Sequence, residues 1–342
     1  MTNITFNRLN GLEIVTLDRP EALNALNSEM IDAISEGILA FDEDPKAVFI
    51  EGAGNRAFCA GGDIKAARLG AIAVREGRIG LNSVVDFFVK EYAMNKALFH
   101  AQLPTISFMN GITMGGGVGI AGACKYRIAT EKTVWAMPEV TIGFFPDVGA
   151  AYYLARAPDH VGKYLGLTGN HLESSGDLIK CGFATHYIYS NKKDDLIEAL
   201  KKREIESVLD QFSESADDYT LPYERISSCF APSSVEEILS ALKKDGSDWA
   251  ISTRNIIQSK SPTSLKVALK HIEAAKNDSF DEVIARDLKL AAFFLAGDDL
   301  IEGVRAAVVD KDKKPMWNPA RLEDVGMKQI EDIFNKNLGL VL

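Results

Sequence analysis

Residues 109–156 read MNGITMGGGVGIAGACKYRIATEKTVWAMPEVTIGFFPDVGAAYYLAR. The stretch opens with a run of glycines at residues 115–117, passes through two short β-like runs, and then presents two carboxylates, Glu139 and Asp147. Glycine lets backbone N–H groups approach a ligand closely, and an acid beside apolar side chains suits acid–base or nucleophilic chemistry. The stretch therefore predicts a site that stabilises a developing anion close to two acids.

The composition of the whole chain limits what such a site can serve. The 342 residues are 46% hydrophobic and 25% charged, which is typical of a soluble globular protein of one large domain or two. The net charge of −10 and the lack of a basic stripe with interleaved aromatics argue against a nucleic-acid partner. No apolar run approaches the roughly 18 residues of a membrane span, so no membrane association is expected.

Cysteine spacing and the first residues bear on location. The four cysteines are far apart and form no CxxC pair: Cys59, Cys124, Cys181 and Cys229. This pattern favours reduced thiols in a cytosolic protein over disulfides or a metal site. Residues 1–17 have neither the basic and apolar regions of a signal peptide nor an Arg/Ser-rich composition. These features predict a cytoplasmic location.

The pattern of hydrophobic residues predicts an α/β fold with a helical C-terminal region. Strands are expected at residues 12–17, 47–50, 104–109 and 184–189. Helices are expected from residue 28 to a stop at Asp44-Pro45, and at residues 82–100, 148–157, 160–167, 194–212, 233–244, 247–258, 263–276 and 281–296. Because the character of the chain changes near residues 190–215, we divide it into a core at residues 1–200 and a helical region at residues 201–342.

The glycine-rich segment admits three interpretations. Residues 117–122 formally match GxGxxG, but a dinucleotide site requires that motif directly after the first strand, and residues 110–114 intervene here. Close packing of a helix is a second explanation. The favoured interpretation is a backbone N–H at a helix N-terminus that points at an oxyanion. A second glycine loop at residues 59–64 could supply another donor, and two such donors would make an oxyanion hole.

The carboxylates also admit structural explanations. Asp147 could cap a helix that begins at Val148, Glu139 could be a solvated turn residue, and Glu91 could be an exposed helical charge. Their setting favours function instead, because buried carboxylates beside apolar groups have raised pKa values. The apolar neighbours of Glu139 and Asp147 are Trp135, Met137, Phe144 and Phe145.

Other catalytic motifs find little support. The chain has no GxSxG elbow and no P-loop. Its five histidines show no metal-ligand spacing, so no metal site is predicted. They are His100, His160, His171, His186 and His271.

Three motifs of the chain resemble those of a known protein family. Residues 56–64 (RAFCAGGDI), residues 114–119 (MGGGVG) and the Pro138-Glu139 pair are similar to the enoyl-CoA hydratase/isomerase (crotonase) superfamily. The similarity covers nearly the whole chain.

Four further motifs resemble one branch of that superfamily, the 3-hydroxyisobutyryl-CoA hydrolases. They are ITMGGGVGI at residues 112–120, MPEVTIGFFPDVG at 137–149, KSPTSLK at 260–266 and EGVRAAVVDKDKKPMWNP at 302–319. The last two are quite specific to the branch.

The resemblance implies a crotonase-like spiral of ββα turns followed by a helical region, and an acyl-CoA substrate. It implies that the N–H groups of Gly62 and Gly116 hold the thioester oxygen. It places Glu91, Glu139 and Asp147 around the acyl group. The full substrate-binding set that we expect is Ala60, Gly62, Asp63, Glu91, Gly116, Glu139 and Asp147. Related folds often form trimers, which leaves a homo-oligomer open.

Gly119 separates hydrolase from hydratase within this resemblance. Hydratases of the family carry a glutamate three residues beyond the oxyanion glycine, where this chain has Gly119, and they usually have glycine where this chain has Asp147. We therefore expect hydrolysis of 3-hydroxyisobutyryl-CoA or a similar short β-hydroxyacyl-CoA, in valine breakdown, with Glu139 and Asp147 as catalytic acids. No cofactor is expected, since coenzyme A is part of the substrate. The alternatives are an enoyl-CoA hydratase/isomerase and a non-catalytic acyl-CoA-binding protein.

Overall fold

The structure is a computed structural model, and it describes residues 3–40 and 45–335. The chain forms two compact units, each assembled from separate segments. The first unit contains Met1–Gly62, Ala93–Ala136 and His171–Leu221, and the second contains Asp63–Tyr92, Met137–Asn170 and Pro222–Leu342. These units interleave along the chain and do not follow a single cut, so the division at residue 200 stays a prediction.

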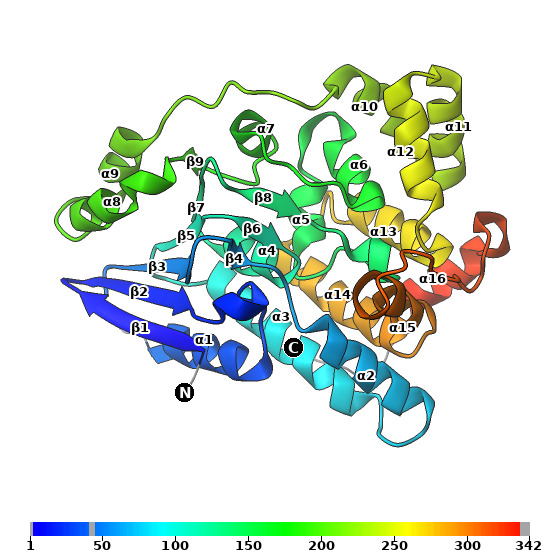
Figure 1. Ribbon diagram of the computed structural model, residues 1–342, viewed down its shortest axis with the longest axis horizontal. Helices are drawn as coiled ribbons and strands as arrows, with labels where there is room; N and C mark the ends of the chain where they lie inside the picture. The colour runs from blue at the N-terminus through cyan, green and yellow to red at the C-terminus, as the bar shows by residue number, and fades with distance from the viewer. Residues whose placement is uncertain (1–2, 41–44, 336–342) are drawn as a thin grey trace. The chain divides into compact units, whose positions relative to one another are not determined.

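The first unit contains a six-stranded sheet in the order β1-β2-β3-β5-β7-β9 (Figure 1). The strands are β1 (Ile4–Leu9), β2 (Leu12–Leu17), β3 (Ala47–Gly52), β5 (Thr105–Met109), β7 (Tyr126–Ala129) and β9 (His186–Tyr187). β1 pairs antiparallel with β2, and each later pair is parallel. The predicted strands at residues 12–17, 47–50 and 104–109 are confirmed, whereas the one predicted at 184–189 is a strand only at its two central residues. β1 was not predicted, because four of its six residues are exposed and Arg8 interrupts the alternation that Ile4 and Phe6 begin.

A second, three-stranded sheet brings the two glycine loops together in this unit. It consists of β4 (Ala57–Cys59), β6 (Ile112–Met114) and β8 (Val134–Ala136), all parallel. In parallel strands the carboxyl ends lie at the same edge. The loops that follow β4 and β6 therefore leave the sheet side by side.

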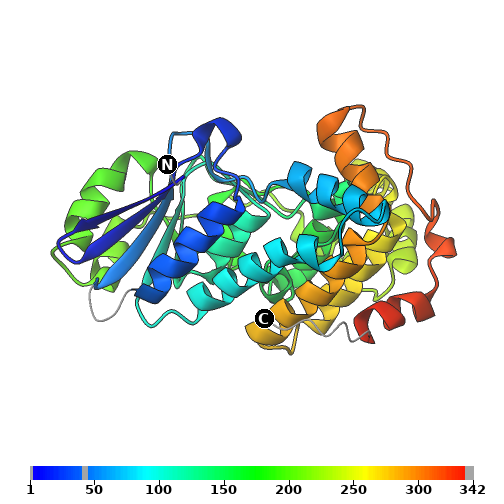
Figure 2. The same cartoon turned by 90° about the horizontal axis from the view of Figure 1, so that it is seen from below.

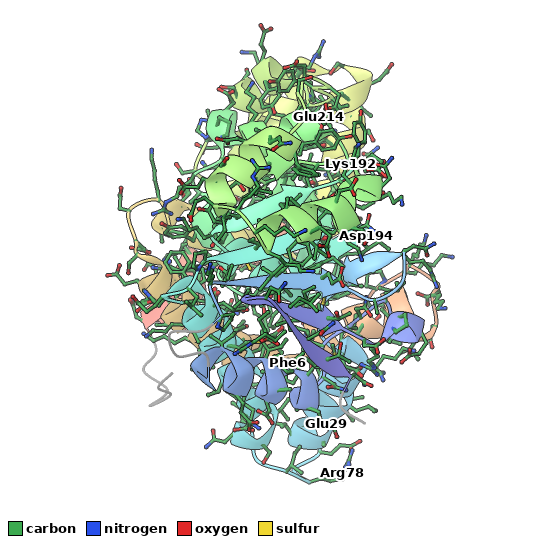
Figure 3. The ribbon with its side chains drawn as sticks, turned by 90° about the vertical axis from the view of Figure 1, so that its left-hand side faces the viewer. Phe6, Glu29, Arg78, Lys192, Asp194 and Glu214 are labelled. Carbon is green, nitrogen blue, oxygen red and sulfur yellow. The ribbon has the colours of Figure 1, made fainter. Side chains whose placement is uncertain are left out.

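Helices cover the larger sheet. α1 (Ser28–Ala40) begins where Asn27 Oδ1 accepts the N–H of Met30 at 2.9 Å, and it lies beside β1 (Figure 2). Gly37 permits that contact, because a Cβ there would lie 2.5 Å from the ring of Phe6, which is labelled on β1 in Figure 3. The predicted stop of this helix at Asp44-Pro45 lies in part outside the described residues.

The predicted helix at residues 194–212 is two helices, α8 (Lys193–Leu200) and α9 (Ile205–Phe212). The residues between them, KKRE, are charged and mostly exposed, and they form a turn. Figure 3 labels Asp194 at the start of α8 and Glu214 after α9. Apolar side chains of both helices join the core of the sheet: Leu196, Leu200, Val208 and Leu209 with Phe49, Phe108 and Ile128.

The second unit is helical. Its longer helices are α2 (Ile64–Arg75), α6 (Val161–Thr168), α10 (Tyr223–Phe230), α11 (Val235–Asp245), α12 (Asp248–Gln258), α13 (Pro262–Ala274), α14 (Phe280–Leu295) and α16 (Met327–Asn335). The predicted helices at 160–167, 233–244, 247–258, 263–276 and 281–296 are confirmed to within a few residues. α3 (Asn82–Phe99) begins in this unit and ends in the first.

Local capping explains where two of these helices begin. Ser261 caps α13, whose first residue is Pro262, a residue that favours the first helical position. Ser279 and Glu282 form a capping box at the start of α14. These two helices carry His271 and Asp287, which are described below.

Two other expectations concern the described residues as a whole. The four cysteines are free and buried, as the prediction of reduced thiols requires. In the described part of the chain, no helix has both the length and the apolar character to span a bilayer.

Candidate active site

In the first unit, Gly116 is the first residue of α4 (Gly116–Ala123). The first N–H groups of a helix have no partner inside it and carry partial positive charge. Gly115 precedes the helix with φ +50°, which glycine adopts readily. The predicted helix N-terminus at this glycine run is therefore confirmed.

The second glycine loop lies against the first. Gly61 has φ +112°, and a Cβ on it would lie 3.8 Å from the N atom of Gly116 and 3.5 Å from the carbonyl oxygen of Met114. A Cβ on Gly117 would lie 2.1 Å from the carbonyl oxygen of Cys59, so only glycine fits there. The two loops thus meet as expected. That Gly62 and Gly116 bind a thioester oxygen stays a prediction.

Two neighbours of Gly62 have local structural contacts. The N–H of Ala60 donates to the carbonyl oxygen of Leu23 at 3.0 Å. In the second unit, the side chain of Asp63 caps α2, where it accepts the N–H of Ala66 at 3.2 Å. These contacts fix the backbone on each side of Gly62. A substrate-binding role for Ala60 and Asp63 stays a prediction.

In the second unit the three predicted carboxylates are all buried. Glu91 on α3 is 3% exposed, Glu139 at the start of a 3-10 turn (Glu139–Ile142) is 7% exposed, and Asp147 is 6% exposed. A solvated turn is therefore excluded for Glu139, and an exposed helical charge is excluded for Glu91.

Asp147 does not cap a helix. The next helix, α5 (Ala150–Leu154), begins three residues later with Gly149 at its N-cap position, and no side chain caps it. Instead, the hydroxyl of Tyr92 donates to Asp147 Oδ2 at 2.6 Å. Burial raises the pKa of Asp147 to about 7, the Tyr92 hydrogen bond opposes this rise, and the charge of Asp287 adds to it. A group with such a pKa can both accept and donate a proton near neutral pH.

Glu91 and Glu139 each have a buried oxygen without a hydrogen-bond partner among the described residues. These atoms are Glu91 Oε1 and Glu139 Oε2. Burial raises the pKa of both glutamates well above the ordinary value, and the charge of Asp147 raises it further. Since buried polar atoms normally have partners, these two oxygens are suited to receive a donor from a ligand.

Aromatic rings supply the apolar surroundings. The ring of Phe144 lies 5.8 Å from that of Phe88 and 5.6 Å from that of Phe294, and Phe88 lies 5.9 Å from Tyr92. Rings at such distances exclude water from the acids beside them in the sequence. Burial is therefore the largest cause of the raised pKa of Glu91, Glu139 and Asp147.

Sequence reasoning missed three polar residues near the acids: Tyr92, His271 and Asp287. Tyr92 was not singled out from the sequence, and His271 was considered only as one of five histidines without metal-ligand spacing. Asp287, by contrast, could have been recognised from the sequence. It lies on the apolar face of α14 between Ile284 and Leu288, where a carboxylate requires a buried partner.

Residues 12–334 match the family described as enoyl-CoA hydratase/isomerase. The chain belongs to the enoyl-CoA hydratase/isomerase family. It is 38% identical over 354 residues to a 3-hydroxyisobutyryl-CoA hydrolase, mitochondrial, of Gallus gallus, covering 98% of this chain and 89% of the relative. It is 40% identical over 336 residues to the Xenopus laevis protein of that name, covering 94% and 86%.

A solved structure shares the fold of this chain. It is a carnitinyl-CoA dehydratase from Mycobacterium thermoresistibile, with a TM-score of 0.90 and 32% identity over 98% of this chain and 97% of that one. The resemblance and the crotonase-like α/β fold expected from the sequence are confirmed.

The names of two relatives contradict the predicted location of the protein. The similar hydrolases of Gallus gallus and Xenopus laevis are named as mitochondrial proteins. The prediction of a cytoplasmic location is therefore wrong. Cysteine spacing and the composition of residues 1–17 did not suffice to assign a compartment, because a reducing environment is not confined to one compartment.

Proposed function

We propose that this member of the enoyl-CoA hydratase/isomerase family hydrolyses the thioester of 3-hydroxyisobutyryl-CoA, or of a similar short β-hydroxyacyl-CoA. One observation carries the proposal. Asp147 is buried and receives a hydrogen bond from Tyr92, whereas Gly119 lacks the carboxyl group that a hydratase of the family has at that position. The names of the relatives that are 38% and 40% identical agree with this activity.

Glu139 is the residue to which we assign the first chemical step. Its carboxylate either attacks the thioester carbon or takes a proton from a water molecule that attacks it. In the first route a C–O bond forms, the C–S bond breaks, coenzyme A leaves as a thiolate that takes up a proton, and water then cleaves the mixed anhydride. The raised pKa of Glu139 makes its ionised form a stronger base than an exposed glutamate.

Asp147 is assigned to proton transfer and to the substrate hydroxyl. Its pKa of about 7 allows it to accept a proton from water or to deliver one to the departing thiolate. Glu91, whose buried Oε1 has no hydrogen-bond partner among the residues that the structure describes, is assigned to the 3-hydroxyl group. We assign the N–H groups of Gly62 and Gly116 to the oxyanion, where such donors typically contribute about 3 kcal/mol to transition-state stabilisation.

The reaction so proposed needs no metal ion and no redox cofactor, because coenzyme A belongs to the substrate. A 3-hydroxyisobutyryl substrate places the enzyme in valine breakdown. A homo-oligomer remains compatible with this function.

Hydration of an enoyl-CoA is the second candidate. The similar structure named carnitinyl-CoA dehydratase favours it. Addition of water across a double bond needs an acid and a base at adjacent carbons. Gly119 leaves one of the two family positions without a side chain, so we rank this candidate lower.

One experiment separates the candidates. Purified protein is incubated with 3-hydroxyisobutyryl-, isobutyryl- and crotonyl-CoA, and free thiol and enoyl absorbance are followed in parallel. Thiol release from the hydroxyacyl thioester with little loss of enoyl absorbance supports the proposal. Faster loss of enoyl absorbance replaces it with the hydratase, and binding without turnover of any thioester replaces it with a non-catalytic binder.

A further inference from the structure

The backbone at Asp147 forms an unusual turn. The N–H of Ala150 donates to the carbonyl oxygen of Asp147 at 2.8 Å, which closes a four-residue turn. Its two central residues both have positive φ, +53° at Val148 and +78° at Gly149. Such turns favour Gly, Asn and Asp at their centre. A β-branched residue with positive φ is an outlier that needs support from its surroundings.

Only glycine fits at position 149. A Cβ on it would lie 2.4 Å from the ring of Phe280, so its backbone lies directly against that ring. Val148 is 1% exposed, and therefore its side chain is held inside the same unit. The turn is thus fixed by packing on both of its central residues, and polar contacts add to this.

A buried pair of side chains supports the turn from behind. The N–H of Gly149 donates to Asp287 Oδ2 at 2.7 Å, and His271 Nε2 lies 2.6 Å from the other carboxylate oxygen, Oδ1. The side chains of His271 and Asp287 are both 0% exposed. The Nη1 atom of Arg286 lies 3.4 Å from His271 Nδ1. A donor at Nδ1 favours the tautomer whose Nε2–H donates to Asp287.

We propose that His271 and Asp287 form a positioning pair, which holds the turn at residues 147–150 and thereby keeps the carboxyl group of Asp147 against the Tyr92 hydroxyl. Asp287 contributes one oxygen to the backbone of the turn and uses the other to fix its own orientation through His271. This inference rests on the proposed function, because it assumes that Asp147 takes part in hydrolysis. Neither His271 nor Asp287 is assigned a contact with the substrate.

The pair has an electrostatic effect as well as a mechanical one. The groups that face Asp147 are Tyr92 and Glu91 of α3, Glu139 of the 3-10 turn and Asp287 of α14. The negative charge of Asp287 raises the pKa of Asp147. His271 and Arg286 face Asp287 and lower its pKa, which burial raises. Loss of the Asp287 charge should therefore lower the pKa of Asp147.

Two substitutions at residue 287 separate these effects. In Asp287→Asn, the amide oxygen can still accept the N–H of Gly149, so the turn keeps its acceptor while the charge is lost. In Asp287→Ala both the acceptor and the charge are lost. A residue displaced by about 1 Å can lose about 100-fold in rate.

Asp177 provides a matched control. It is also 0% exposed, and its Oδ2 accepts the N–H groups of Thr220 and Leu221 and the hydroxyl of Thr220. The Asp177→Asn variant therefore alters a buried aspartate that supports a backbone segment, and it leaves the acids that are assigned to hydrolysis unchanged. It reports what a loss of stability alone does to the activity.

The experiment measures kcat, KM and the pH midpoint of kcat for thiol release by wild type and the three variants. It also follows the titration of Asp147 by infrared difference spectroscopy, with Asp147→Asn to identify the band. We expect Asp287→Asn to lower the pH midpoint with kcat within about tenfold of wild type, and Asp287→Ala to lower kcat by about 100-fold with little change in KM. Asp177→Asn should leave the midpoint unchanged.

An unchanged midpoint and titration in Asp287→Asn overturn the proposal, as does an Asp287→Ala variant whose kcat falls no more than that of Asp177→Asn. If Asp287→Ala does not fold, Asp287→Asn and the infrared titration decide. If wild type cleaves no thioester, the proposed function fails, whereas the infrared titration still tests whether Asp287 controls Asp147.

Discussion

Replacement of Tyr92 by phenylalanine tests the proposed role of Asp147 most directly. The substitution removes one oxygen atom and leaves the ring that packs 5.9 Å from Phe88. It deletes the 2.6 Å hydrogen bond from the tyrosine hydroxyl to Asp147 Oδ2. Because that hydroxyl stabilises the ionised form, its loss makes the carboxyl group harder to ionise. The pKa of Asp147 should therefore rise.

The size of the rise follows from the kind of hydrogen bond. A bond to a charged group contributes about 1.5–3 kcal/mol, and about 1.4 kcal/mol corresponds to one pKa unit. Starting from a pKa of about 7 for Asp147, the pH midpoint of kcat should move upward by about one to two units. The shift is opposite in sign to the one expected for Asp287→Asn.

The assay is thiol release from 3-hydroxyisobutyryl-CoA over a range of pH, at saturating substrate so that kcat is observed. Circular dichroism and thermal unfolding show whether the variant keeps its fold. A midpoint that stays where it is in wild type, or that moves downward, would refute the reasoning, because the hydroxyl would then not stabilise the Asp147 carboxylate.

Four other predictions concern the proposed hydrolysis. Glu139→Gln, which keeps the shape and removes the charge, should lower kcat at least about 100-fold in the thiol assay with binding largely retained; near-normal turnover would remove Glu139 from the mechanism. Gly116→Val should lower kcat by about 100-fold or more by displacing an oxyanion donor, and a folded variant with normal turnover would contradict this. Isobutyryl-CoA should be cleaved far more slowly than its 3-hydroxy analogue, since a site built for a hydroxyl leaves buried groups unpaired without it; equal rates would exclude such a site. Because the pKa of Asp147 is raised from 3.8 to about 7 in the folded protein, the native state binds more protons than the unfolded state, and the free energy of unfolding should fall as pH rises from about 4 to 7. Denaturant titrations of wild type and Asp147→Asn over this pH range measure the change. A gain in the stability of wild type relative to the variant would show that the sign is wrong.

Local patterns were sufficient for most of the fold. Residues 12–17 and 47–50 form strands because their apolar, β-branched residues suit a pleated and buried surface. The helix at 247–258 follows from its periodicity and from Ser247, whose hydroxyl caps it. β1 was not predicted because it is an edge strand with mostly exposed residues, and Arg8 interrupts its short alternation of apolar residues. The pairing of β4 with β6, which joins the two glycine loops, is a contact between residues far apart in sequence.

The candidate site was predicted only in part, because several of its contacts join residues that lie far apart in the sequence. Glu139 and Asp147 could be recognised from the apolar residues beside them and from the family motif. Their partners could not, because Tyr92 lies 55 residues from Asp147, and Asp287 lies 138 residues from Gly149. Nothing in the local sequence of α3 or α14 encodes which loop each side chain meets. The structure was needed to show that Asp147 accepts a hydrogen bond and does not cap a helix.

We expect the substrate hydroxyl to have a second role, because the charges of Asp147 and Glu139 influence each other. Burial raises the pKa of Glu91, Glu139 and Asp147, and the hydrogen bond from Tyr92 opposes this rise at Asp147. The charge of Asp147 raises the pKa of Glu139 further. A 3-hydroxyl group that donates to Asp147 spreads this charge, which favours ionisation of Glu139 at the moment when the thioester is bound. The hydroxyl should therefore act on kcat as well as on binding, and single-turnover measurements with isobutyryl-CoA at saturation separate the two. A loss confined to KM would show that the hydroxyl serves recognition alone.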